Sequence, residues 1–210
     1  KKMRLDNYLN EEDEVSDIQI KCSKILYLYT KQHNYFYRGT RNLSRKKLIM
    51  TRKDRKPLQT NPDVHELLDN MFYEKFGWKV RSEGVFATSY ESDAKIYNAF
   101  IPIPQNNPPN DPPVFVPVNG FKYIWSPRVR DLYIYLIDNG LHEAPGRGLG
   151  MEYNDTWASR VQKIIDSYIT YDLERAMKKE YEVMFKCDHG YYLIDQDEIL
   201  KFLFSEGKKI

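Results

Sequence analysis

The stretch Gly84–Tyr97 constrains the fold most, because it passes from strand character to helix character without a break. Val85, Phe86 and Thr88 are strand formers, and the glycine before them marks the start of the strand. The residues that follow have the spacing of one helical face, and a serine before them can cap the helix. Hydroxyl groups beside a helix N-terminus predict a place for an anionic ligand, whereas the simpler interpretation is an ordinary strand–helix joint.

The rest of the chain continues this mixture of helices and short strands. Apolar residues at helical spacing predict helices over 16–29, 61–76, 127–138, 155–177 and 195–204. Short apolar runs between turn residues predict strands over 34–40, 85–89, 115–118, 121–125, 180–187 and 191–194. Separate short strands among helices predict an α+β fold. We expect one domain over 1–210, with a helical region over 1–33, a core over 34–194 and a C-terminal helix over 195–210.

Two turns in this pattern predict β-hairpins. Asn119-Gly120 lies between the strands predicted over 115–118 and 121–125, and this pair favours a two-residue hairpin turn. Asp188-His189-Gly190 separates the last two predicted strands in the same way. We therefore expect each of these strands to pair with its neighbour along the chain.

Composition excludes several classes of protein. The chain has 210 residues, of which 41% are hydrophobic and 14% aromatic, enough for a packed core. Its two cysteines lie far apart, so they indicate no disulfide framework and no zinc site, and a reduced, cytoplasmic compartment is the simplest assignment. The four histidines are not closely spaced, so we expect no metal. No apolar run reaches the ~18 residues of a membrane span, and no secretory signal is expected.

Three short motifs lie at or near the ends of predicted strands. They are Tyr37-Arg38-Gly39-Thr40, Phe86-Ala87-Thr88-Ser89 and the run from Glu180 to Phe185, which begins Glu180-Tyr181-Glu182. In this order they resemble the ADP-ribosyltransferases of the Arg–Ser–Glu class, the toxin-like and arginine-specific branch. The resemblance covers roughly residues 34 to 194. It implies a split β-sandwich of short strands flanked by helices, and NAD as the substrate.

The resemblance also implies a role for each motif. Glu182 would hold the ribose 2′-hydroxyl and stabilise the oxocarbenium-like charge that develops when nicotinamide leaves. Glu180, two residues earlier on the same strand face, would steer the acceptor nucleophile. Arg38 would bind a phosphate of NAD through its planar guanidinium group. The remaining cofactor-binding candidates are Gly39, Thr40, Phe86, Thr88, Ser89 and Tyr97.

The chain departs from the family pattern in the second motif. Ala87 stands where the family has the first serine of Ser-Thr-Ser, whose hydroxyl supports the catalytic glutamate. Ala87 and Ser89 would share one face of a strand, so Ser89 is the candidate replacement. Small relatives of this kind occur in bacteriophages, and for such a source the compartment would be the cytoplasm of a bacterial host.

A basic run supports a different class of function. Nine basic residues and one acidic residue lie between Arg38 and Pro57. Such a run suits contacts with nucleic-acid phosphates, and it also suits an acceptor-binding surface of the enzyme. The candidates for this surface are Arg45, Lys46, Lys47, Arg52, Lys53 and Arg55. The alternatives are therefore a transferase acting on a protein or nucleic-acid acceptor, a nucleic-acid-binding protein, and an interaction protein that keeps the scaffold without catalysis.

Overall fold

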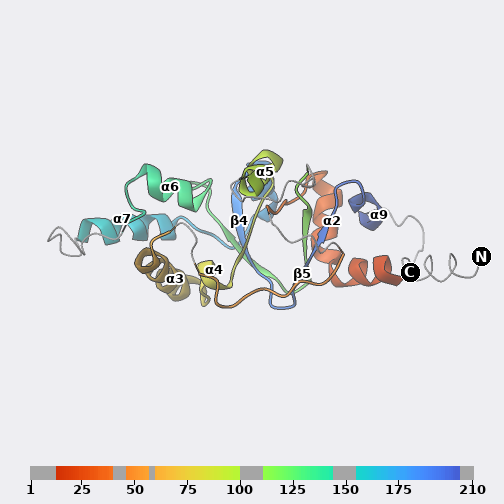
Figure 1. Cartoon of the computed structure of the whole chain (residues 1–210), viewed down its shortest axis with the longest axis horizontal. Coiled ribbons are helices and arrows are strands. Elements are labelled where there is room, and N and C mark those ends of the chain that lie inside the picture. The colour runs from red at the N-terminus through yellow and green to blue at the C-terminus, as the bar shows by residue number, and fades with distance from the viewer. Residues whose placement is uncertain (1–12, 40–45, 57–59, 100–110, 144–154, 204–210) are drawn as a thin grey trace, which may run out of the picture. The chain divides into compact units, whose positions relative to one another are not determined.

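A computed structural model describes residues 13–39, 46–56, 60–99, 111–143 and 155–203 of the chain (Figure 1). Within this part the fold is a mixture of helices and small sheets, so the α+β prediction is confirmed at that level. Residue contacts divide the chain into two compact units, each built from separate segments. Unit 1 comprises Lys1–Met50, Thr88–Phe121 and Asp188–Ile210, and unit 2 comprises Thr51–Ala87 and Lys122–Cys187.

Unit 1 is organised around the antiparallel pair of β2 (Val114–Pro117) and β5 (Tyr191–Ile194). Tyr37 forms isolated bridges with both Thr88 and Val114, so the segment predicted as the first strand is reduced to short backbone contacts. Ile49 forms a further bridge with Tyr191 at the other side of β5.

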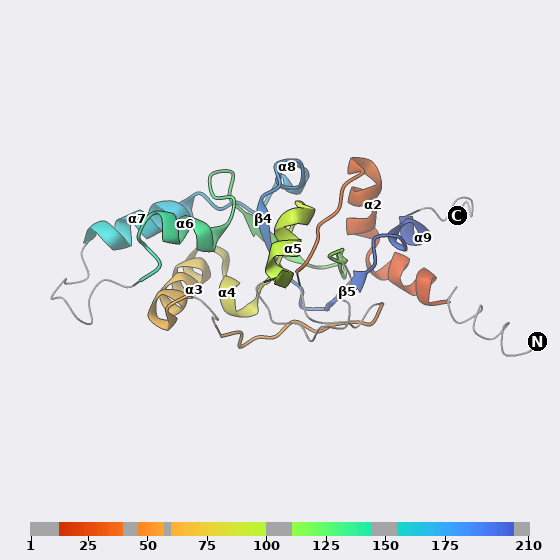
Figure 2. The ribbon, with the colours of Figure 1, turned by 45° about the horizontal axis from the view of Figure 1, so that its top comes forward.

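Unit 1 also contains helices, of which α2 (Ser23–Gln32) packs against β2. The others are the helical residues 13–21, α5 (Glu91–Ala99) and α9 (Ile199–Leu203). α9 packs beside α2, as both ribbon views show (Figures 1 and 2). The Tyr29 hydroxyl, fully buried, donates a hydrogen bond to the Phe115 carbonyl at 2.5 Å, which joins α2 to β2.

Unit 2 contains a three-stranded sheet in the order β1-β4-β3. Its strands are β1 (Val85–Thr88, whose last residue is counted in unit 1), β3 (Lys122–Trp125) and β4 (Glu182–Lys186). β3 and β4 are antiparallel, with Ile124 opposite Met184. The helices are α3 (Pro62–Phe76), α4 (Val80–Glu83), α6 (Leu132–Asp138), α7 (Asp155–Asp166) and α8 (Leu173–Lys178).

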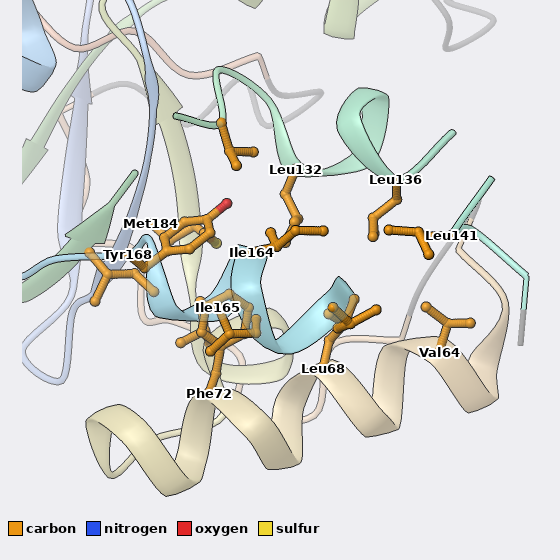
Figure 3. Packing of buried hydrophobic residues seen from close by; sticks show 14 of the residues in the cluster. Val64, Leu68, Phe72, Leu132, Leu136, Leu141, Ile164, Ile165, Tyr168 and Met184 are labelled. Carbon is orange, nitrogen blue, oxygen red and sulfur yellow. The ribbon is translucent and has the colours of Figure 1, made fainter. Parts of the chain in front are cut away.

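α3 forms as the sequence predicts, because its signals are local. The Asn61 side chain accepts a hydrogen bond from the Asp63 N–H at 2.8 Å, Pro62 occupies the first turn, and Gly77 ends the helix with φ 76°. Its buried side chains meet those of α6, α7 and β4 in one apolar core (Figure 3). The residues labelled there are Val64, Leu68, Phe72, Leu132, Leu136, Leu141, Ile164, Ile165, Tyr168 and Met184.

Both predicted hairpins are wrong. β2 pairs with β5 rather than with β3, and β4 pairs with β3 and β1 rather than with β5. Within unit 1 the two predicted turns lie next to each other: the Val118 N–H donates to the Gly190 carbonyl at 3.1 Å, and a Cβ on Gly120 would lie 3.1 Å from the His189 ring. The strands on either side of each turn therefore do not pair with each other, and each of them pairs with a strand that is distant in the sequence.

Several predicted helix boundaries are also wrong. The helix predicted over 16–29 is interrupted at Cys22, and α7 ends at Asp166 because the chain becomes extended and Ile169 bridges Trp125. α6 begins at Leu132 rather than at 127, since the Asp131 side chain accepts the Ile134 N–H at 2.9 Å and so caps the helix. The residues before it are held in a turn by the Ser126 hydroxyl.

Candidate functional site

Glu182 lies at the first position of β4, and the segment that leads into α6 holds it there. Its backbone N–H donates to the Arg130 carbonyl at 2.8 Å, and its side-chain Oε2 accepts the Leu132 N–H at 3.4 Å. The second contact is long for a hydrogen bond, so the carboxyl group has a weak donor on one oxygen. The residue as a whole is partly exposed.

The surroundings of Glu182 disfavour its ionised form. Burial of the carboxyl, followed by the negative charge of Asp131, raises its pKa to about 8. The guanidinium groups of Arg81 and Arg55 and the Leu132 N–H act in the opposite direction and offset only part of this rise. Glu182 therefore carries a proton near neutral pH, as carboxyl groups in catalytic sites often do. Burial and the same carboxyl raise the pKa of the Tyr168 hydroxyl.

Phe86 and two arginines belong to the same unit as Glu182. The Phe86 ring lies 4.5 Å from the Arg55 guanidinium carbon and 5.8 Å from that of Arg81, both within the range of cation–π contact. Arg81 also donates to the Thr60 hydroxyl at 3.0 Å. The Phe86 ring is thus in contact with cationic groups.

A buried polar cluster fixes the position of Arg81. Asp69, only 3% exposed, accepts the Arg81 N–H at 2.6 Å and the Ser82 N–H at 3.3 Å, and the Ser82 hydroxyl donates to its other oxygen. His65 lies 3.2 Å from the same hydroxyl, and burial lowers its pKa despite the nearby Asp69. No pattern in the sequence predicts this cluster or the effect of Asp131, because the groups that meet there lie on different elements.

Arg38 lies in unit 1, in the segment that bridges Thr88 and Val114. Its backbone N–H donates to the Pro113 carbonyl at 3.1 Å, and its guanidinium carbon lies 5.7 Å from the Tyr191 ring centre. The side chain is partly exposed, and Gly39 follows it as the last described residue of the segment.

The second motif is hydrogen-bonded to the first within unit 1. The backbone N–H of Tyr37 donates to the Thr88 carbonyl at 2.7 Å, and the Tyr37 carbonyl accepts the Thr88 N–H at 3.0 Å. Thr88 and Ser89 are each 6% exposed. β1 ends at Thr88, so Ser89 lies beyond the strand and the expected strand face shared with Ala87 does not exist.

The helix after β1 does not suit an anion at its N-terminus. α5 begins at Glu91, so neither of the serines around it is the residue that precedes the helix. Glu91 and Asp93 lie in its first turn, and Glu91 pairs with Lys95 at 2.7 Å. Two carboxylates already complement the helix dipole and would repel a bound anion.

Glu180 does not lie on the strand of Glu182, which corrects the expectation that the two share a strand face. It stands in the turn between α8 and β4, with φ 59° in the left-handed region, and it is exposed. The alternation of side chains along a strand therefore does not relate the two glutamates.

The other predicted site residues occupy varied positions. Lys46 pairs with Glu198 at 2.7 Å, Lys47, Arg52 and Lys53 are exposed, and Arg55 contacts Phe86. Thr40 and Arg45 lie outside the described residues, as does the side chain of Tyr97. The structure thus joins the segments of the first and second motifs in unit 1, and it places the strand of Glu182 beside β1 in the sheet of unit 2.

Within the described ranges, no group of three or more His, Cys, Asp and Glu side chains is arranged to hold a metal ion. None of the described helices has the length and apolar character needed to cross a bilayer. Comparisons with protein-family models, with curated proteins and with solved structures gave no match.

Proposed function

We propose that the chain is a mono-ADP-ribosyltransferase that moves ADP-ribose from NAD to a macromolecular acceptor, a protein or a nucleic acid. One observation carries this proposal. β4, which begins with Glu182, is the direct neighbour of β1, which carries Phe86-Ala87-Thr88. The resemblance requires these two motifs on core strands, and their pairing could not be read from residues so far apart in the chain.

The chemistry assigns a defined step to Glu182. The bond between nicotinamide and the ribose C1′ breaks, its electron pair leaves with nicotinamide, and the ribose acquires oxocarbenium-like charge. An ionised Glu182 stabilises that charge, and the acceptor nucleophile then forms the new bond to C1′ and releases its proton to solvent. The cationic nicotinamide ring of NAD favours ionisation of a nearby carboxyl group, so substrate binding lowers the pKa of Glu182 from its raised value.

Arg38 and Ser89 keep the roles that the resemblance gives them, phosphate binding and support of the nicotinamide end. Arg38 is a partly exposed residue whose guanidinium carbon lies 5.7 Å from the Tyr191 ring centre, and a guanidinium group can bind phosphate oxygens through its planar N–H fork. Ser89 is buried, which suits a hydroxyl that orients another group rather than one that reacts.

The test measures three quantities on the full chain: NAD binding, nicotinamide release, and transfer of label from NAD to proteins and nucleic acids of a lysate. Glu182→Gln preserves the size of the side chain and should abolish release and transfer while leaving NAD binding within a few-fold. Glu66→Gln, an exposed carboxyl on α3, is the matched control and should behave as the unsubstituted chain. Absence of NAD binding at millimolar concentrations would refute the proposal.

A second candidate is a nucleic-acid-binding protein, and the exposure of the basic run favours it. Lys47, Arg52, Lys53 and Lys56 are all exposed, with Asp54 as the acidic residue among them. Affinity for nucleic acid would fall steeply with salt concentration through release of counterions. Neutralising Lys47, Lys53 and Lys56 would remove this affinity, whereas Glu182→Gln would not change it. The transferase proposal instead predicts that Glu182→Gln abolishes NAD consumption.

A further inference from the structure

Unit 2 has a cavity of about 200 Å³ between α6, α7 and the loop that precedes α6. Three cationic side chains line it, Arg128, Arg160 and Lys163, together with the polar Tyr135, Asn139 and Ser167. Apolar side chains complete the lining, and no acidic residue is among them. The cavity is thus positively charged and has an apolar part.

The fold fixes the frame around these cations. Arg160 and Lys163 are three residues apart on α7 and so lie on one face of that helix. An Arg160 nitrogen (Nη2) donates to the Asn139 carbonyl at 3.0 Å, which holds the guanidinium group against the end of α6. The Arg128 N–H donates to the Ser126 hydroxyl at 3.1 Å, and that hydroxyl lies 2.6 Å from the Ser167 hydroxyl.

The three cationic residues of the cavity, Arg128, Arg160 and Lys163, are exposed. Among the residues that the structure describes, none forms an ion pair with them. Three like charges beside one hollow repel one another, and an anion in the hollow replaces this repulsion with attraction.

We propose that this cavity binds the phosphate group of a small phosphorylated molecule. Guanidinium groups bind phosphate oxygens in pairs through their planar N–H fork, and the lysine adds a point charge. A phosphate monoester carries close to two negative charges at neutral pH, which matches three cations better than the single charge of each phosphodiester in a nucleic acid. The apolar part of the cavity accommodates the carbon portion of the molecule.

The cavity and the surroundings of Glu182 share the segment that precedes α6 but use different side chains. The groups that set the pKa of Glu182 are Asp131, Arg81, Leu132 and Arg55, and none of them lines the cavity. Loss of phosphate binding would therefore leave the transferase proposal intact, and loss of NAD consumption would leave the cavity proposal intact.

The experiment uses titration calorimetry and thermal unfolding of the full chain, with inorganic phosphate and ribose 5-phosphate as probes and chloride to keep the ionic strength constant. The unsubstituted chain should bind both probes saturably, with ribose 5-phosphate the tighter of the two. The double variant Arg160→Gln with Lys163→Gln should bind at least tenfold more weakly. Lys178→Gln with Lys179→Gln removes the same charge from exposed positions at the end of α8 and should bind as the unsubstituted chain does.

Arg160 also contacts the Asn139 carbonyl, so a second double variant guards against a structural effect. Arg128→Gln with Lys163→Gln keeps that hydrogen bond and should weaken binding to a similar degree. Equal weakening in the α8 control would overturn the proposal, because the effect would then be one of net charge. Absence of saturable binding would also overturn it. An oligonucleotide without terminal phosphates that binds through the same cations, while ribose 5-phosphate does not, would show that the ligand class is wrong.

Discussion

Replacing Glu182 by glutamine should make unit 2 more stable at high pH and leave its stability almost unchanged at low pH. The carboxyl has a pKa of about 8 in the folded chain, against 4.5 when it is free in water. Between these values the unfolded chain loses the proton while the folded chain keeps it, so the folded state is progressively disfavoured as pH rises. The contribution of the protonated carboxyl is fully present below pH 4.5 and is lost as pH approaches 8.

The size of the effect follows from the same pKa. At 1.36 kcal/mol for each pKa unit, the rise corresponds to an upper limit of about 5 kcal/mol. The partial exposure of Glu182 lets solvent reduce this value, so we expect Glu182→Gln to gain about 2 to 4 kcal/mol at pH 9 relative to pH 4. For a chain of this size, that corresponds to a rise in Tm of roughly 5 to 15 °C.

The tryptophans make the measurement specific. All three, Trp78, Trp125 and Trp157, are buried in unit 2, so their fluorescence follows the unfolding of the unit that contains Glu182. Urea unfolding at a series of pH values, with Glu66→Gln as the control, gives the difference in free energy of unfolding directly. A difference that does not vary with pH would refute the reasoning. So would a loss of stability at high pH, because it would mean that the arginines stabilise an ionised Glu182.

Three further predictions rest on separate contacts. If the proposed transferase function holds, kcat/KM for NAD should rise with pH up to about 8 and then level off, because Glu182 of the free enzyme would have to lose its proton. A flat pH profile would contradict this prediction. Gly190→Ala should lower the free energy of unfolding in urea by about 2 to 4 kcal/mol, because φ is 85° and the new Cβ would lie 2.8 Å from the Ile49 carbonyl oxygen. The control Gly77→Ala, also at positive φ but with open space around the new Cβ, should lower it by only about 1 kcal/mol. Asp69→Ala should cost about 3 kcal/mol by tryptophan fluorescence, since it leaves two backbone N–H groups of α4 without their acceptor, and Asp69→Asn should recover part of this.

The sequence predictions were accurate where neighbouring residues determine an element, and they failed where residues distant in the sequence determine it. α3 has its cap, its first-turn proline and its terminal glycine within its own sequence, and it was predicted at both ends. The two hairpins were wrong because Asn119-Gly120 favours a reversal only when nothing else pairs with it. In the folded chain the Asn119 N–H donates to the Lys21 carbonyl and the Asn119 side chain accepts the Lys24 N–H, while the preceding Val118 N–H donates to the Gly190 carbonyl. Local turn preferences cannot predict such distant partners.

The candidate site shows the same division. The strand that begins at Glu182 was identified from its residues, although its start was placed two residues early, at Glu180. The groups that decide its protonation come from Asp131, Arg81 and Arg55, which lie on other elements, and no spacing in the sequence connects them. Local sequence patterns identified Glu182, whereas its raised pKa could be found only from the tertiary structure.

The environment of Glu182 is difficult to explain by packing alone. A glutamate that serves mainly to bind arginines has a lowered pKa, since the cations favour its charge. Here two guanidinium groups act on the carboxyl and its pKa still rises, because burial and Asp131 outweigh them. The hydrogen bond from the Leu132 N–H, at 3.4 Å, is one that a glutamine carbonyl could accept equally well. Burial and Asp131 thus make the ionised carboxyl costly to the fold, and a glutamate kept at such a cost is the residue at which a search for an activity should begin.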